Sequence, residues 1–328
     1  MLKALVTGSN GFIGSFLVER LLEKEYQVFC LVRKTSDLRW IRHLDVHFIT
    51  GELVQPATLV DAVQDKDAVF HLAGVTKARD FEGYMRGNYQ ATVNLLEAME
   101  KYGKKNQKLV FVSSQAAGGP AQGSTPMSED QTAQPISAYG KAKLRAEEAV
   151  LRFAASHPAV IIRPPTVYGP RDKDVLAMFR YIQKGFLPIL GDGHQKISVV
   201  HVHDLVEGIV LAAEKSEANG KLYYMTSDGV STWREIGDAI AKALNKRCVT
   251  FSIPIWLLNV VSFFSVLYLK LNQKAALLNG DKVKEIKQGS WLCSNRLAKA
   301  ELGFSPRIDL DEGMRSTAAW YKKMGWIK

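Results

Sequence analysis

Tyr139 and Lys143 stand four residues apart in the run Tyr139-Gly140-Lys141-Ala142-Lys143, at the start of a segment with helical periodicity. Residues i and i+4 share one face of a helix, so the phenol and the ammonium group are expected to lie together. A phenol with an ordinary pKa of about 10 is a poor acid or base at neutral pH. A neighbouring ammonium favours the phenolate, so we expect Lys143 to lower the pKa of Tyr139. The pair can then exchange a proton with an alcohol or a carbonyl group.

Ser113 and Ser114 directly follow the apolar run Leu109–Val112, and Ser114 precedes Tyr139 by 25 residues. Such a run is typical of a buried strand, and ligands bind beyond the carboxyl ends of parallel strands. A hydroxyl at that place can donate to a carbonyl oxygen and stabilise the charge that develops there. With a nicotinamide as hydride carrier, these groups would interconvert an alcohol and a carbonyl compound.

The run Thr7-Gly8-Ser9-Asn10-Gly11-Phe12-Ile13-Gly14 follows the first apolar run and opens a helical segment. Its three glycines allow a tight turn, a close approach of the backbone to a pyrophosphate, and close packing of the helix on the strand. The helix N-terminus then offers N–H groups and partial positive charge to the phosphates. The turn predicts dinucleotide binding; the alternative is a tight turn without a ligand.

The second apolar run ends in Leu31-Val32-Arg33-Lys34. An NAD-binding protein usually has Asp or Glu there, which accepts a hydrogen bond from the ribose 2′-hydroxyl. Arg33, with Lys34 beside it, suits a 2′-phosphate instead. The sequence therefore favours NADP(H) as cofactor. The alternative is an exposed arginine that leaves NAD(H) binding possible.

The first half of the chain alternates apolar runs with amphipathic segments, which predicts an α/β fold with a Rossmann-type, doubly wound parallel sheet. The apolar runs are Ala4–Thr7, Val28–Val32, Val46–Ile49, Ala68–Leu72, Leu109–Val112 and Val160–Ile162. The helical segments are Phe12–Lys24, Ala57–Val63, Ala91–Tyr102 and Ala138–Phe153. After about residue 165 this rhythm breaks. We expect a dinucleotide-binding domain over 1–167, to which 197–214 returns, and a smaller C-terminal substrate-binding lobe over 168–328.

Composition narrows the classes of protein that this chain can belong to. It has 328 residues, 47% hydrophobic and 23% charged, with a net charge of +10, which excludes a disordered or collagen-like chain. Cys30, Cys248 and Cys293 lie far apart, which excludes a disulfide scaffold and a cysteine-rich zinc site. No nucleic-acid-binding motif accompanies the basic charge, so no nucleic-acid partner is expected. The first residues lack the pattern of a signal peptide, so a cytoplasmic protein is expected.

The sequence resembles the extended short-chain dehydrogenase/reductase family, the NAD-dependent epimerase/dehydratase group, over nearly its whole length. The matching stretches are the glycine-rich turn, Gly51-Glu52-Leu53, Asp67–Ala73, Asn88 with the residues that follow it, Ser113-Ser114, Tyr139-x-x-x-Lys143, Arg163–Pro170 and His201–Leu205. The resemblance implies a Rossmann domain with Ser114, Tyr139 and Lys143 as catalytic triad. Ser114 matches the family better than Ser113 by its spacing to Tyr139. Lys143 would also hold the nicotinamide ribose.

The resemblance also implies which residues line the cofactor. Glu52 stands where the family usually has Asp near the adenine. The residues expected at the dinucleotide are Gly8, Asn10, Gly11, Phe12, Ile13, Gly14, Arg33, Lys34, Glu52, Leu53, Leu72, Ala73, Asn88, Ser113, Tyr139, Lys143, Pro164, Thr166 and Val167.

Two departures from the family bear on the substrate. Members that act on nucleotide sugars usually carry Asn where this chain has Thr166, and Arg where it has Ile197. Without that arginine a diphosphate loses a strong charge-assisted contact. The chain is more similar to the 3β-hydroxysteroid dehydrogenase and dihydroflavonol reductase branch. That implies a hydrophobic secondary alcohol or ketone, steroid-, isoprenoid- or flavonoid-like. The alternatives are a nucleotide-sugar 4-epimerase or dehydratase with bound NAD, and a non-catalytic dinucleotide-binding subunit.

The stretch Phe251–Leu271 carries no charge from 251 to 269. It predicts a helix in the substrate lobe; a helix lying on a membrane surface and a membrane span are the alternatives, so peripheral membrane association stays open. A homodimer could form through the helices over 91–102 and 138–153.

The histidines are not expected to bind a metal. His201 and His203 lack a third ligand at suitable spacing, so no metal site is expected there. His71 lies within an apolar run and is expected to be a core histidine whose ring nitrogens are hydrogen-bonded.

Overall fold

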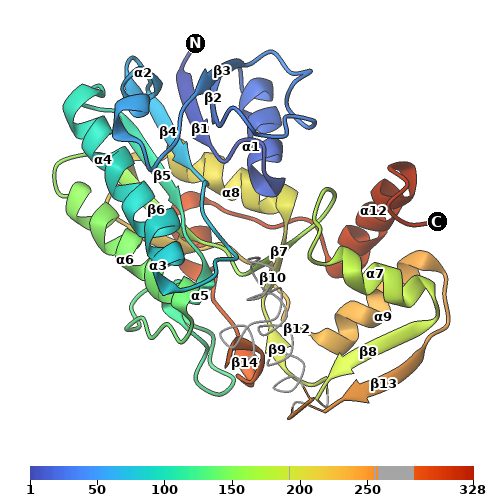
Figure 1. Ribbon diagram of the computed structural model, residues 1–328. Coiled ribbons are helices and arrows are strands. Elements are labelled where there is room, and N and C mark those ends of the chain that lie inside the picture. The colour runs from blue at the N-terminus through green and yellow to red at the C-terminus, as the bar shows by residue number, and fades with distance from the viewer. Residues whose placement is uncertain (192, 255, 258–283) are drawn as a thin grey trace.

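The structure is a computed structural model that describes residues 1–191, 193–254, 256–257 and 284–328. Its centre is a seven-stranded sheet of order β11-β6-β5-β4-β1-β2-β3 (Figure 1). The strands are β1 (Lys3–Thr7), β2 (Gln27–Val32), β3 (His47–Thr50), β4 (Ala68–His71), β5 (Lys108–Val112), β6 (Ala159–Arg163) and β11 (Leu222–Tyr224). Every neighbouring pair is parallel. The predicted fold class is confirmed.

Strand order reverses between β1 and β4, because β1 pairs with β2 on one side and with β4 on the other. A crevice opens outside the carboxyl ends of the strands at such a point, and ligands of open α/β sheets bind there. The turn after β1 and the ends of β4 and β5 all meet this edge of the sheet. The topology therefore places the predicted glycine turn and the predicted serines at one crevice.

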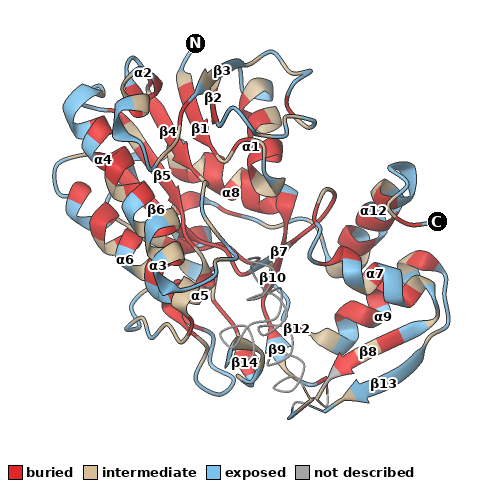
Figure 2. Ribbon diagram, in the orientation of Figure 1, coloured by how far each residue is buried: buried red, intermediate tan, exposed pale blue. Residues whose placement is uncertain are grey.

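Helices cover both faces of the sheet because side chains along each strand alternate between the two faces. Val6 packs with α1 (Phe12–Glu23) and α8 (Val202–Glu214) in one buried cluster. Leu5 belongs to the opposite cluster, with α4 (Ala91–Tyr102) and α6 (Ala138–Phe153). Figure 1 shows the two pairs of helices on opposite sides of the sheet, and Figure 2 shows the strands between them almost wholly buried.

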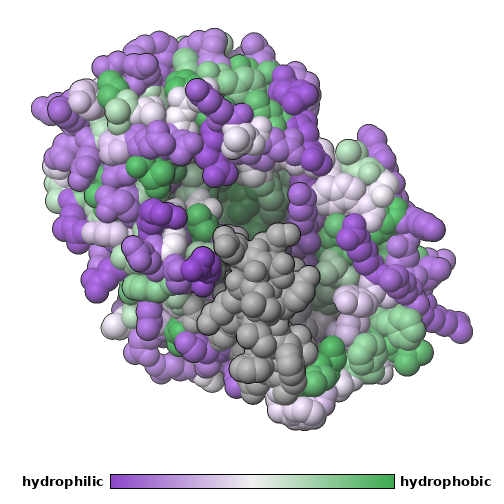
Figure 3. Space-filling model, viewed as in Figure 1, coloured by the Kyte–Doolittle hydropathy of each residue, from purple (hydrophilic) through white to green (hydrophobic). Residues whose placement is uncertain are grey.

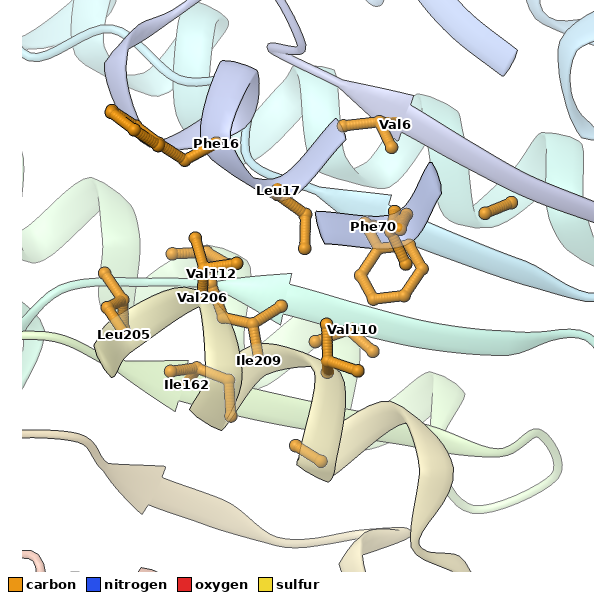
Figure 4. Packing of buried hydrophobic residues seen from close by; sticks show 14 of the residues in the cluster. Val6, Phe16, Leu17, Phe70, Val110, Val112, Ile162, Leu205, Val206 and Ile209 are labelled. Carbon is orange, nitrogen blue, oxygen red and sulfur yellow. The ribbon is translucent and has the colours of Figure 1, made fainter. Parts of the chain in front are cut away.

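Residues after 167 supply the last strand of the sheet and a helix that covers one of its faces. β11 adds the edge strand beside β6, and α8 lays Leu205, Val206 and Ile209 against Val110 and Ile162 of the sheet (Figure 4). The division of the chain at residue 167, with a return over 197–214, is our proposal for its domains.

The remaining elements form a smaller lobe with a core of its own. Its main elements are α7 (Leu176–Gln183), β8 (Phe186–Leu190), α9 (Trp233–Leu244), β13 (Val249–Ile253) and α12 (Leu310–Lys323). Short strands lie between the lobe and the sheet: β7 (Thr166–Tyr168) with β10 (Val199–His201), and β9 (Lys196–Ile197) with β12 (Ser231–Thr232) and β14 (Ser290–Trp291). The large sheet and this lobe thus flank a region of short strands (Figure 1).

The helix predicted over 251–271 is wrong at its start. Residues 249–253 form strand β13, which pairs in parallel with β8. Alternate apolar and polar residues, Phe251-Ser252-Ile253, suit a strand with one covered face. Residues 255 and 258–271 of that segment lie outside the described residues. Among the residues that the structure describes, no helix is long and apolar enough to cross a bilayer.

The two lobes contact each other through Arg171 and a group of aromatic rings. The Arg171 guanidinium donates to Ser15 Oγ at 2.9 Å and to Glu19 Oε1 at 2.6 Å, both on α1. Trp40, in the loop after β2, lies with its ring centroid 5.5 Å from Trp320 of α12 and 6.4 Å from Trp326. The C-terminal residues therefore pack on the loop that follows Arg33.

Candidate active site

The glycine-rich turn has the geometry of an anion-binding turn. Gly8 has φ +72°, and a Cβ there would lie 2.8 Å from the Ala73 backbone nitrogen. A Cβ at Gly14 would lie 2.1 Å from the Gly8 carbonyl oxygen. Gly11 begins α1 without a side-chain cap, and the first turn holds no acidic residue. Backbone N–H groups and the positive helix end are thus left for a negatively charged group. The turn fits a dinucleotide pyrophosphate.

Loops at the ends of β2 and β3 border the same crevice. Arg33 and Lys34 follow β2 with exposed side chains, and the Arg33 backbone N–H donates to Ser36 Oγ at 3.0 Å. Asn10 Nδ2 donates to the Asp37 carbonyl at 3.3 Å, which ties this loop to the glycine turn. After β3, the Leu53 carbonyl accepts from Asn94 Nδ2 at 2.8 Å, while Glu52 and Leu53 are half-buried.

Asn88 holds the backbone that follows β4. Its Oδ1 accepts from the Val75 N–H at 2.9 Å, and its Nδ2 donates to the carbonyls of Val75 and Tyr84 at 3.0 and 3.1 Å. A side chain at Gly74 would meet Asn88 Oδ1 at 2.7 Å. The Asn88 side chain therefore acts on the crevice indirectly. It fixes the backbone that directly follows Leu72 and Ala73.

His71 is a core histidine, and both of its ring nitrogens are hydrogen-bonded, as predicted. Nδ1 lies 2.7 Å from Thr7 Oγ1 and Nε2 lies 3.0 Å from Thr92 Oγ1. Burial lowers the pKa of His71 to about 3, and the nearby Lys143 charge acts in the same direction. The ring is therefore neutral at physiological pH.

The structure brings Ser114, Tyr139 and Lys143 together. Ser114 caps the short helix α5 (Gln115–Gly118), and its Oγ accepts from the Ala116 N–H at 3.2 Å. The Ser114 side chain lies close enough to Tyr139 to lower the pKa of its phenol. One helical turn after Tyr139, Lys143 Nζ donates to the Val112 carbonyl at 2.8 Å and lies 4.2 Å from the centre of the Phe111 ring. The junction of β5 and α5 thus positions the Ser114 hydroxyl, while α6 carries both the Tyr139 phenol and the Lys143 ammonium.

The prediction that Lys143 lowers the pKa of Tyr139 is wrong for this structure. Burial raises the pKa of Tyr139 to about 12, against the effect of the Ser114 side chain, which lowers it. Burial also lowers the pKa of Lys143 to about 7, against the charge of Glu147, which raises it. Both shifts have one cause, the loss of hydration of the charged form. The Lys143 ammonium is directed at a backbone carbonyl, so its charge does little for the phenolate.

The remaining predicted residues lie on the carboxyl side of β5 and β6. The Ser113 Oγ is buried without a hydrogen-bond partner among the described residues, so it is available to a ligand. The Pro164 carbonyl accepts from the Gln115 N–H at 2.8 Å. Thr166 and Val167 lie in β7. An unpartnered buried hydroxyl and a glycine cradle both fit a bound dinucleotide.

Sequence reasoning missed two charged residues behind the site, Glu147 of α6 and Arg163 of β6. They form a buried ion pair in which Arg163 Nε and Nη2 contact the two carboxylate oxygens at 2.9 and 2.5 Å. The signal was present in the sequence: Tyr139, Lys143 and Glu147 recur every four residues, which puts a carboxylate on the same face of the helix as the phenol and the ammonium group.

Comparison with known proteins agrees with this geometry. Residues 4–225 match the model of the NAD dependent epimerase/dehydratase family. A ceramide reductase of Caulobacter vibrioides is 27% identical, and the alignment covers 98% of this chain and 95% of that protein. The human sterol-4-alpha-carboxylate 3-dehydrogenase, decarboxylating, is 25% identical, covering 99% and 90%. The crystal structure of a UDP-glucuronic acid 4-epimerase from Bacillus cereus, with UDP-glucuronic acid and NAD, has a TM-score of 0.78 at 26% identity, covering 98% and 100%.

Proposed function

Because the chain belongs to the NAD-dependent epimerase/dehydratase family, we propose that it is an NADP(H)-dependent oxidoreductase that interconverts a secondary alcohol and a ketone. The observation that carries this proposal is the Tyr139 phenol, which lies one helical turn from Lys143 and close enough to Ser114 for that side chain to lower its pKa. A proton donor, an oxygen-orienting hydroxyl and a cation at one crevice suit carbonyl chemistry.

The proton steps follow from the state of each group. With its pKa raised to about 12, Tyr139 is protonated at neutral pH and can donate. In the reducing direction the ketone oxygen accepts hydrogen bonds from Ser114 and Tyr139. A nicotinamide cofactor, held by the glycine-rich turn with Ser113 and Lys143 at its nicotinamide end, would supply the hydride. The Tyr139 phenol donates its proton to the substrate oxygen as the C=O bond becomes C–OH. The tyrosinate then regains a proton from solvent. The reverse sequence oxidises the alcohol.

The proposed cofactor rests on Arg33 and Lys34. Two cations with exposed side chains follow β2, at the position where NAD-binding proteins place an acid. A guanidinium can bind a 2′-phosphate through two parallel hydrogen bonds. The glycine turn would hold the pyrophosphate, and Ser113, Tyr139 and Lys143 would border the nicotinamide end.

An apolar substrate is supported by three observations. Ile197 is 3% exposed while its neighbour Lys196 points outward, so no cation stands where nucleotide-sugar enzymes have arginine. Figure 3 shows the molecule hollowed between its lobes, with apolar residues at the back of the hollow. The ceramide reductase and the sterol dehydrogenase are named for hydrophobic substrates.

A nucleotide-sugar epimerase is the second candidate. It is favoured by the likeness to the UDP-glucuronic acid 4-epimerase over nearly the whole chain. A non-catalytic subunit is disfavoured, because such a protein has no need to keep both Tyr139 and Lys143.

The test is a turnover assay of purified protein with NADPH and NADH. Its substrates are a panel of steroid, isoprenoid and long-chain ketones, set beside UDP- and dTDP-sugars. We expect NADPH-dependent reduction of an apolar ketone. Tyr139→Phe should lower kcat by at least about a hundredfold and leave NADPH affinity unchanged, because only the proton donor is removed. Tyr102→Phe, exposed at the end of α4, is the matched control. Full activity in Tyr139→Phe, or conversion of sugar nucleotides alone, would contradict the proposal.

A further inference from the structure

We propose that Glu147 is a positioning residue of this active site: held by Arg163, it is the fixed negative charge that favours the protonated form of Lys143 within the buried face of α6. The catalytic role of Glu147 in this inference rests on the proposed function. Its structural content can be tested without turnover.

The geometry begins with spacing on one helix. Tyr139, Lys143 and Glu147 occupy successive turns of α6, each four residues from the next. Lys143 is 3% exposed and Glu147 is 1% exposed. A buried carboxylate without a partner would cost several kcal/mol, so its place in the core needs a specific counter-charge.

Arg163 supplies that counter-charge from the neighbouring strand. Its Nε and Nη2 contact the two Glu147 oxygens at 2.9 and 2.5 Å, in the two-pronged geometry that fixes a carboxylate most firmly. Its Nη1 donates to the Tyr224 hydroxyl at 2.9 Å. The backbone N–H of Tyr224 in turn donates to Glu129 at 2.9 Å. The carboxylate therefore cannot swing toward or away from Lys143.

This fixed position raises the question of why Glu147 is there. An apolar pair of similar volume is often as stable as a buried ion pair. Here the carboxylate also acts on Lys143, since its charge raises the pKa of that lysine while burial lowers it to about 7. Among the described residues, the other groups that these contacts place around the ammonium bring no negative charge: the Val112 carbonyl, the Phe111 ring, neutral His71 and the protonated Tyr139 phenol.

The groups that face Glu147 complete the charge balance. They are Arg163 of β6, the phenols of Tyr224 on β11 and Tyr139, and Lys143 itself. Arg163 stays charged in the interior because its pKa is raised by Glu147, although burial opposes this. Two cations and one carboxylate thus share the region. Removal of the carboxylate charge leaves nothing to offset the burial of Lys143.

The experiment is a pH titration of Lys143 by NMR, in protein labelled with ¹³C at the lysine ε-carbon. The Lys143→Arg variant identifies the resonance by its disappearance. Four proteins are compared with and without NADPH: wild type, Glu147→Gln, Glu147→Gln/Arg163→Met and Glu148→Gln. Glu147→Gln alone strands a buried guanidinium, which destabilises the fold. The double variant removes both charges and replaces them with side chains of similar volume, so the proposal can still be tested if Glu147→Gln does not fold. Thermal melting establishes which variants fold.

We expect the pKa of Lys143 to fall by about one unit or more in whichever folded variant lacks Glu147, because a nearby opposite charge is worth that much. Glu148→Gln removes an exposed carboxylate that pairs with Arg145 on the outer face of α6, and Lys143 should then titrate as in wild type. An unchanged Lys143 titration in the folded double variant would overturn the proposal and leave Glu147 a structural anchor only. Because no substrate is consumed, that outcome is independent of whether the protein reduces ketones.

Discussion

Arg33 is the residue on which our proposal of NADP(H) as cofactor depends. Its exposed side chain follows β2 beside the loop that Asn10 ties to the glycine turn. Arg33→Ser should weaken NADPH binding by about tenfold to a hundredfold, since hydrogen bonds to charged groups contribute about 1.5–3 kcal/mol, and leave NADH binding unchanged. Isothermal titration calorimetry with both cofactors measures this. Arg42→Ser, exposed in the same loop, is the control; equal losses for NADPH and NADH would refute the assignment.

His71 makes stability depend on pH. Its pKa is lowered from 6.5 to about 3 by burial. Between those values the unfolded chain binds the proton and the folded chain does not, so the free energy of unfolding falls as pH falls through this window. The Tm of His71→Asn should therefore fall by less between pH 7 and pH 4.5 than the Tm of wild type does. His43 is exposed, and the Tm of His43→Asn should fall by as much as the Tm of wild type. The idea fails if all three proteins lose the same Tm.

At the residue scale, sequence spacing predicted the partners but not their electrostatics. Tyr139, Lys143 and Ser114 meet at one crevice because helix and strand periodicities determine where side chains point. The pKa of Tyr139 depends on how much protein covers the phenol. That covering comes from chain segments far away in sequence, and no local pattern reports it.

Among the elements, the turn between β1 and α1 tolerates the least change. A Cβ at Gly14 would lie 2.1 Å from the Gly8 carbonyl oxygen, a backbone atom that cannot yield without moving the turn. Gly14→Ala should lower the free energy of unfolding by about 1–3 kcal/mol and weaken binding of both NADPH and NADH. Thermal melting and cofactor titration test this. At Gly229 nothing lies within 4 Å of an added Cβ, so Gly229→Ala should be neutral. Unaltered cofactor binding in Gly14→Ala would show that the turn is not the pyrophosphate site.

Elements with a strong sequence pattern were predicted more accurately than elements with a weak one. The helix expected over Ala138–Phe153 begins and ends at those residues, because Ser137 caps its first turn and buried residues then recur at helical spacing as far as Phe153. The helix expected over Ala57–Val63 is divided into a 3-10 helix over Pro56–Leu59 and α2 (Val60–Val63). β11 was not recognised as a member of the main sheet. It has three residues, and its strand character comes from pairing with β6.

On the scale of the whole molecule, Arg171 joins the two lobes. It donates to Ser15 and Glu19, and its guanidinium lies 4.2 Å from the centre of the Phe16 ring. Arg171→Ala should lower the free energy of unfolding by about 2 kcal/mol, because two charge-assisted hydrogen bonds and their packing are lost. Thermal melting measures the effect, with exposed Arg315→Ala on α12 as the control. A Tm equal to that of wild type would mean that the contact does not stabilise the lobe arrangement.

Several elements that complete the fold come late in the sequence, and this has a consequence for folding during synthesis. They are β11, α8 and the Trp320–Trp326 region. A ribosome that has released only the first 167 residues presents a nascent sheet with one apolar face covered by α1 but not by α8, and with the outer edge of β6 open. Trp40 meets these aromatic neighbours only when Trp320 and Trp326 have been translated. Folding of the amino-terminal half is therefore complete only after residue 326 has been made, and a ribosome stalled before then would expose a surface that chaperones recognise.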